Sequence, residues 1–121
     1  MRTIGQALND FFSSFGLPAY PTDAVPDDVK YPWITYEYKT GSYGDEVSIA
    51  ATIWYHTESE ATPNAKAKEI GDRIGLGGIM LEAEGGAIWL KKDAPWCQSL
   101  TDENDRAAKG RQLLIRAEFL T

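Results

Sequence analysis

The stretch EVSIAATIWYH, residues 46–56, alternates between apolar and polar side chains and sets the fold class. Successive side chains of a strand point to opposite faces of a sheet, so each kind gathers on one face. One face would carry Val47, Ile49, Ala51, Ile53 and Tyr55. The other would carry Ser48, Thr52, Trp54 and His56. We therefore predict a strand with one face packed on a core.

A shorter alternation comes just before this strand. After Trp33, the residues Ile34, Tyr36 and Tyr38 alternate with more polar ones, and residues 41–45 supply turn chemistry. We predict a hairpin of these two segments, with Ile34, Tyr36 and Tyr38 on the core face.

Residues 3–15 carry apolar side chains at helical spacing. The stripe consists of Ile4, Leu8, Phe11, Phe12 and Phe15. Thr3 and Gln6 have the form of a capping box, and Gly16 stands where a C-terminal cap is expected. These signals predict a helix, whereas the four prolines within residues 18–32 predict a long surface loop.

A second helix is predicted to begin at Thr62 and Pro63, with the threonine as N-cap and the proline at the first helical position. Its apolar stripe would be Ala67, Ile70 and Ile74.

Gly85 and Gly86 suit the turn of a second hairpin. This turn would place Glu84 opposite Ala87, Ala83 opposite Ile88, and Leu81 opposite Leu90. The core face would then carry Ile79, Leu81, Ala83, Ile88 and Leu90, and the outer face Met80, Glu82, Trp89 and Lys91.

The polar segment TDENDRAAKGR, residues 101–111, reads as the start of a short helix because acidic residues follow Thr101. The last strand is predicted over residues 112–120. Its core face would carry Leu113, Ile115, Ala117 and Phe119.

Together these elements predict an α+β fold in the order α-β-β-α-β-β-β. Two helices would pack on one face of a mostly antiparallel five-stranded sheet. With 121 residues, the chain is expected to form a single domain over residues 1–121.

Charge and composition narrow the function. Twelve basic against eighteen acidic residues give a net charge of −6, and the basic residues are scattered. Tight binding to nucleic acid is therefore not expected, because it needs a basic patch. No apolar run is long enough for a membrane span, and the N-terminus does not resemble a signal peptide. The single cysteine, Cys97, fits a reducing compartment.

Candidates for catalysis or metal binding are few. His56 is the only histidine, and Cys97 has no evident base beside it. Asp102, Glu103 and Asp105 are close in sequence but lack the spacing of a calcium-binding loop. We predict no catalytic, cofactor or metal site, and no enzymatic activity.

Aromatic residues outside the predicted core favour a protein interface, where tryptophan and tyrosine are enriched. Trp54 and Trp89 fall on the face opposite the core, and Trp33 and Trp96 each follow a proline. The candidate oligomer or partner interface comprises Asp27, Asp28, Tyr31, Trp33, Trp54, Trp89 and Trp96.

Several stretches resemble the tail terminator family of siphophages and prophages, also described as tail-completion, tail-to-head joining or minor capsid proteins. They are the amphipathic N-terminal helix, VPDDVKYPWITYEY, SIAATIWYHTES, GGAIWLKKDAPWCQ and DRAAKGRQLLIRAEFL. The resemblance implies an α+β subunit that forms a ring, typically a hexamer, on the last turn of the tail tube. The ring would join the tube to the head connector in the virion neck, after assembly in the cytoplasm of the bacterial host. DNA would pass through it without specific binding. The family offers no motif residue with a chemical role to carry over.

Two other classes remain open. A small acidic inhibitor or immunity-type protein would mask a basic partner enzyme and would be monomeric alone. A small enzyme or carbohydrate binder would need a concave pocket with converging polar groups.

Overall fold

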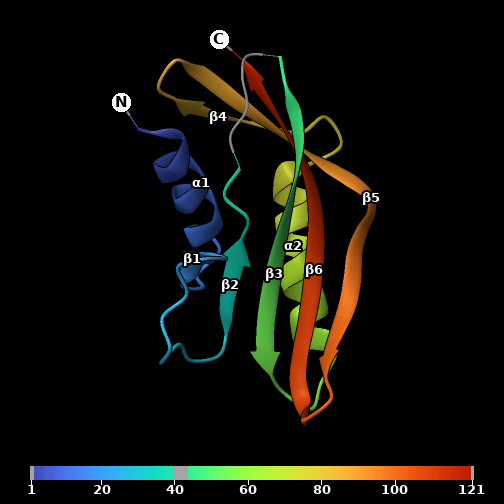
Figure 1. The fold of residues 1–121 in the computed structure, drawn as a ribbon. Helices are drawn as coiled ribbons and strands as arrows, with labels where there is room; N and C mark the ends of the chain where they lie inside the picture. The colour runs from blue at the N-terminus through green and yellow to red at the C-terminus, as the bar shows by residue number, and fades with distance from the viewer. Residues whose placement is uncertain (1, 40–43, 121) are drawn as a thin grey trace.

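A mixed sheet curls like half a barrel around two helices (Figure 1). The computed structural model describes residues 2–39 and 44–120, and within them the sheet has six strands in the order β1-β2-β3-β6-β5-β4. The helices are α1 (Ile4–Ser13) and α2 (Ala61–Ile74). The strands are β1 (Ala19–Pro21), β2 (Trp33–Tyr36), β3 (Glu46–His56), β4 (Ile79–Ala83), β5 (Gly86–Asp102) and β6 (Asp105–Leu120).

The prediction of five mostly antiparallel strands is wrong. The additional strand, β1, lies at the edge of the sheet inside the segment expected to be loop, and it runs parallel to β2 with Ala19 opposite Ile34. Its three residues are too few to show an alternation, and prolines stand at positions 18 and 21. Tertiary pairing forms this strand: the Ile34 amide donates to the Pro18 carbonyl at 2.9 Å.

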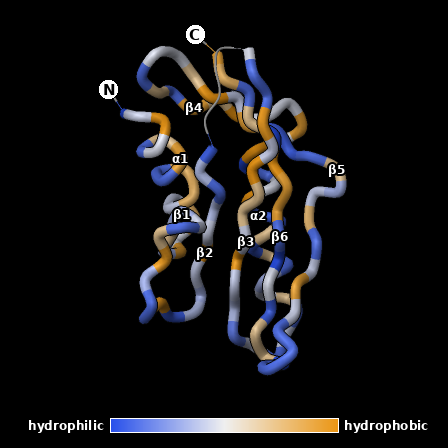
Figure 2. The backbone as a smooth tube through the Cα atoms, viewed as in Figure 1, coloured by the Kyte–Doolittle hydropathy of each residue, from blue (hydrophilic) through white to orange (hydrophobic). Residues whose placement is uncertain are grey.

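The central strand β3 follows the predicted alternation. Ile49, Ala51 and Ile53 are buried, and their neighbours on the other face are partly or fully exposed. Figure 2 shows the same alternation of hydropathy along β3 and β6. Both helices pack into one core cluster with these side chains, so both lie on the same face of the sheet.

The last hairpin is much longer than expected. The short helix predicted after Thr101 is wrong, because β5 runs on to Asp102 and β6 begins at Asp105. The polar residues are held in strands by their neighbours: Lys109 lies opposite Tyr55 on one side and Thr101 on the other. Strand pairing in the middle of a sheet thus overrides the polar composition of this segment.

The β4–β5 hairpin has the predicted faces but a different register. Leu81 lies opposite Ile88 instead of Leu90, and Ala83 lies opposite Gly86. The turn residues are therefore Glu84 and Gly85, with Gly85 at a φ of 79°. A slip of two residues preserves which side chains share a face, so hydrophobic alternation alone does not exclude it.

The N-terminal helix begins as predicted. Thr3 and Gln6 form a reciprocal capping box, with bonds of 3.1 and 2.8 Å. Phe12 is fully buried, and its ring stacks on Tyr36 at 4.9 Å between centroids. Burial of this face docks α1 on the sheet.

Two boundary predictions are wrong. Helix α2 begins at Ala61 after Glu60, so Thr62 is not its N-cap, and the Glu60 carboxylate instead bonds to Arg111. Strand β2 ends at Tyr36, and Tyr38 is half exposed, with its ring near Gly5 of α1. The predicted turn at residues 41–45 falls largely outside the described residues. No helix within the described part of the chain is both long and apolar enough to cross a membrane.

Candidate interaction surfaces

Two tryptophans stand side by side on the outer face of the sheet, the face that the helices do not cover. Trp33 of β2 lies directly opposite Trp54 of β3. Trp54 in turn lies opposite Gly110 of β6 and covers it: a Cβ built on Gly110 would be 2.9 Å from the ring. The glycine thus provides a flat seat for the indole, and both tryptophans stay partly exposed.

Trp89 lies on the same outer face but far from this pair. Its neighbours across the sheet are Met80 and Glu118, and Glu118 lies opposite Glu46 at the start of β3. Glu46 and Trp54 are eight positions apart in β3, which is about 27 Å along a strand. The two predicted tryptophans therefore form separate sites at opposite ends of the face.

Trp89 is fixed in place by polar contacts. Its indole nitrogen donates to the Gly77 carbonyl at 2.9 Å, and the Lys91 ammonium lies 4.4 Å from the ring centroid. Lys91 and Arg116 both bond to Glu46, and these two contacts lower the pKa of the Glu46 carboxyl. The charges at this end of the outer face are thus largely satisfied by one another.

Trp96 lies on the helix side of the sheet, unlike the other three tryptophans. Its indole nitrogen would be 3.0 Å from a Cβ built on Gly71 of α2. Here β5 loses its regular pairing with β6 between Lys92 and Cys97, so residues on both sides of this irregularity turn towards α2. The result is an open groove of about 400 Å³, lined by Asn64, Ala67, Lys68, Gly71, Asp72, Lys92, Trp96 and Cys97.

The loop that carries the other predicted residues lies at the end of the sheet opposite Trp89, near the β5–β6 turn (Figure 1). The Tyr31 ring contacts His56 at 5.3 Å, and His56 Nε2 lies 2.9 Å from the Asp105 carboxylate. A bond from the Ala107 amide, followed by the His56 contact, lowers the pKa of Asp105. Asp27 and Asp28 are exposed on this loop. Figure 2 shows the turn as largely hydrophilic and the loop as a mixture of hydrophilic and hydrophobic residues.

This acidic end does not form a recognisable metal centre. Among the described residues, no three histidine, cysteine or acidic side chains are grouped so that they could hold a metal ion. Asp105 is engaged by His56 and by a backbone amide, and Asp102 accepts from the Asn104 amide at 2.9 Å.

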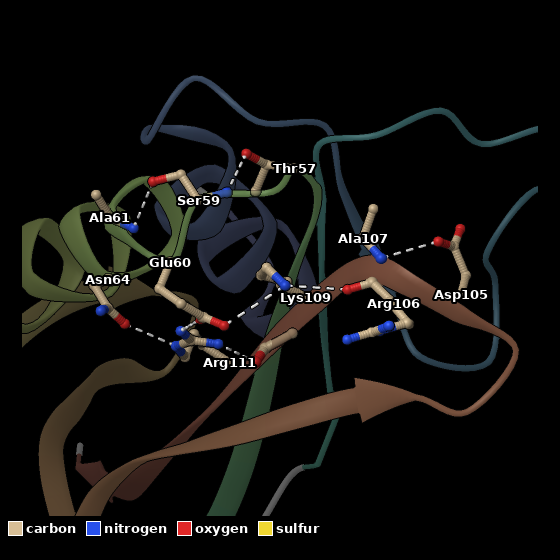
Figure 3. Close-up of polar contacts among 11 residues, drawn as sticks. Thr57, Ser59, Glu60, Ala61, Asn64, Asp105, Arg106, Ala107, Lys109 and Arg111 are labelled. Atoms are coloured by element: carbon tan, nitrogen blue, oxygen red, sulfur yellow. Dashed lines mark hydrogen bonds and ion pairs between the residues drawn. The ribbon is translucent and has the colours of Figure 1, made fainter.

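A buried arginine, missed by the sequence reading, ties α2 to β6 (Figure 3). Arg111 is 5% exposed; its guanidinium bonds to the Glu60 carboxylate, to Asn64 Oδ1 at 2.9 Å and to the Gly110 carbonyl at 2.9 Å. Arg111 shares the alternation of Leu113, so its position in the sequence already placed it on the core face. A charged residue on that face was the available signal.

Comparison with known proteins finds no family model, no curated protein and no solved structure that matches this chain. A functional conclusion for this chain therefore rests on its own residues and geometry.

Proposed function

We propose that this chain is a phage tail terminator, a structural subunit without enzymatic activity that forms a ring on the end of the tail tube. The observation that carries the proposal is the pair of tryptophans on the outer face of the sheet. Trp33 and Trp54 lie directly opposite each other there, whereas both helices pack on the other face. A solvated face has no need of paired tryptophans, whereas interface cores are enriched in them.

The tryptophans are well suited to anchoring a partner. Trp54 rests on Gly110, and Trp89 is bonded to Gly77, so each ring is held before any partner arrives. Binding then loses little side-chain entropy, which is the advantage of a preorganised anchor. Such anchors support lasting contact between subunits or with a neighbouring structural protein.

A ring also needs two different patches on each subunit. A heterologous interface repeats head to tail and closes when its rotation divides a circle. The outer aromatic face, with the acidic end beside it, and the Trp96 groove on the helix side of the sheet are chemically different surfaces. They support a ring, for which the family resemblance implies six copies.

The remaining parts of the proposal concern partners and location. The ring would contact the tail tube protein on one side and the head-tail connector on the other, in the neck of the virion. The net charge of −6 suits a lumen through which DNA passes without binding, because like charges repel.

The experiment is deletion of the gene, followed by electron microscopy of the particles. Tails of uncontrolled length and heads without joined tails are expected, and expression of the protein in trans should restore joined particles. Normal particles from the deletion strain would overturn the proposal. A gene neighbourhood that contains no tail genes would also overturn it.

The acidic end favours a second candidate, a small inhibitor that masks a basic enzyme. Asp27 and Asp28 are exposed on the loop that leads to Tyr31, whose ring contacts His56, the partner of Asp105. This protein would be monomeric and would bind one enzyme in a defined stoichiometry. Light scattering of the purified protein in the presence of isolated tail tubes separates the candidates, since an inhibitor would neither self-assemble nor bind tubes.

A further inference from the structure

The Trp96 groove combines an apolar floor with one cation that has no acidic partner. Ala67, Gly71 and the partly exposed Trp96 ring supply the apolar surface. Of its two lysines, Lys68 is paired with Asp72 at 2.7 Å. Lys92 makes no ion pair within the described residues, and its ammonium lies 5.9 Å from the centroid of the Trp96 ring.

The groove also lies beside a free strand edge. Strand β5 pairs with β4 only as far as Leu90, so from Lys91 to Asp102 the paired strand in the described structure is β6 alone. Beyond the irregular stretch that contains Pro95, which has no N–H, the backbone of this edge can accept a further extended segment, as exposed edges commonly do. A segment that enters the groove could therefore bond to the β5 backbone and contact Trp96 together.

The β5–β6 turn has the complementary chemistry. Glu103 and Asn104 form its tip, and both are exposed. Glu103 has no hydrogen-bond or ion-pair partner in the part of the chain that the structure describes, whereas the neighbouring Asp102 and Asp105 are engaged within the turn. The tip thus presents a free carboxylate just beyond the end of β3, which pairs with β6 as far as Ala108.

We infer that the β5–β6 turn of one copy of this chain docks in the Trp96 groove of the next copy, with Glu103 beside Lys92. A turn cannot reach the groove of its own molecule, because Cys97 and Asp102 are five positions apart in β5, about 17 Å along the strand. The contact joins two different patches, so it repeats head to tail as a ring requires. This inference rests on the proposed function and names the subunit contact that would build the ring.

The unique cysteine makes the contact directly testable. Cys97 lines the groove, so the substitution Asn104→Cys places a second thiol on the tip that should dock there. Under mild oxidation at alkaline pH, this variant should form covalent trimers and larger species on non-reducing gels, because each copy can link to two neighbours. The wild type and the variant that combines Asn104→Cys with Cys97→Ser carry one thiol each, so neither can exceed a dimer.

A matched control separates docking from random collision. Met80→Cys retains Cys97 and adds an equally accessible thiol, since Met80 is 52% exposed, at the opposite end of the sheet. The initial rate of multimer formation for Asn104→Cys should exceed that for Met80→Cys by about tenfold or more, as for a specific contact worth about 1.4 kcal/mol. Equal rates would overturn the inference.

Charge reversal then tests the Glu103–Lys92 pair. In the Asn104→Cys background, Lys92→Glu and Glu103→Lys should each slow cross-linking by about tenfold, and the double reversal should restore most of the rate. Lys39→Glu makes the same charge change beside Glu37 and Ser48, away from both patches, and should have little effect. Circular dichroism confirms that each variant is folded. Single reversals without effect, or a double reversal without recovery, would overturn the pairing.

Failure of the inference differs from failure of the proposed function. Without cross-links, joined particles that depend on the gene would show that the ring uses another contact. Normal particles from the deletion strain would contradict the function itself, whatever the gels show.

Discussion

The seat of Trp54 on Gly110 gives the sharpest test of the outer face. The substitution Gly110→Ala adds a Cβ that would lie 2.9, 3.0 and 3.1 Å from three atoms of the Trp54 ring. Because side-chain atoms do not approach so closely, the indole must swing away from the sheet and lose its packing. Overpacking in a core costs about 1–3 kcal/mol. The Trp54 indole is partly exposed and can shift, so a cost near the lower end of that range, about 1 kcal/mol of the free energy of unfolding, is expected.

The same substitution should be favourable once the indole is gone. Gly110 does not have a positive φ, so alanine fits its backbone, and replacing glycine stabilises by about 0.4–1 kcal/mol through the unfolded chain. In a Trp54→Ala background, Gly110→Ala should therefore stabilise the protein. The entropic gain is common to both backgrounds, so the coupling energy of the cycle equals the clash, about 1 kcal/mol.

The assay is urea denaturation of the four proteins at low micromolar concentration. Ellipticity is the appropriate signal, since Trp54→Ala changes the fluorescence. Coupling smaller than about 0.5 kcal/mol would mean that the two substitutions are additive and that Trp54 does not rest on Gly110. Stabilisation by Gly110→Ala in both backgrounds would refute the reasoning in the same way.

Three further predictions concern the core, the charged end of the outer face and the groove. Phe12→Ala should lower the free energy of unfolding by about 3–5 kcal/mol in urea denaturation, because Phe12 is fully buried. Lys91 and Arg116 lower the pKa of Glu46, so its contribution to stability is present above the unfolded value, about 4.3, and is lost as the pH falls through the lower folded value. Glu46→Gln should therefore destabilise at neutral pH, and the urea midpoints of variant and wild type should converge in acid. Burial raises the pKa of the Cys97 thiol, so alkylation by iodoacetamide should be slower than for a free cysteine near neutral pH and should accelerate at higher pH than for that cysteine.

Local patterns were sufficient to predict the faces of the longer elements. The alternation in β3 placed Ile49 and Ile53 in the core, and the capping box placed the start of α1. Both signals depend on residues that are close together in sequence, so the packing of the rest of the chain does not change them. The same patterns cannot detect a three-residue parallel edge strand such as β1, whose formation depends on the backbone of β2.

Errors arose where distant residues decide the structure. Glu60 precedes α2 without a capping bond because its carboxylate bonds to Arg111, fifty-one residues away in sequence. The register of β4 and β5 differs by two residues from the prediction, which leaves every face unchanged. The sequence groups Trp96 with the other tryptophans of the candidate interface, but the irregular pairing before Cys97 turns it towards α2. For the candidate surfaces, sequence alternation thus gave the face of Trp54 but not the neighbour on which it rests.

Three of the four tryptophans meet a glycine: Trp54 covers Gly110, Trp89 covers Gly78 and Trp96 covers Gly71. Each ring therefore also has a role within its own subunit, because it shields backbone that a glycine leaves bare. The same packing favours partner binding, since an indole already fixed against its own chain loses little conformational freedom when a partner covers it.

The two roles make opposite demands on an experiment. Removing a tryptophan damages the fold and the docking surface together, so loss of assembly does not distinguish the two roles of the indole. The substitution Gly110→Ala displaces the Trp54 indole from the glycine on which it rests but leaves the indole available to a partner. If the Gly110→Ala subunit stays folded and still assembles into the oligomeric ring, Trp54 mainly stabilises its own sheet. If assembly fails while the subunit stays folded, the position of the indole is itself part of the interface.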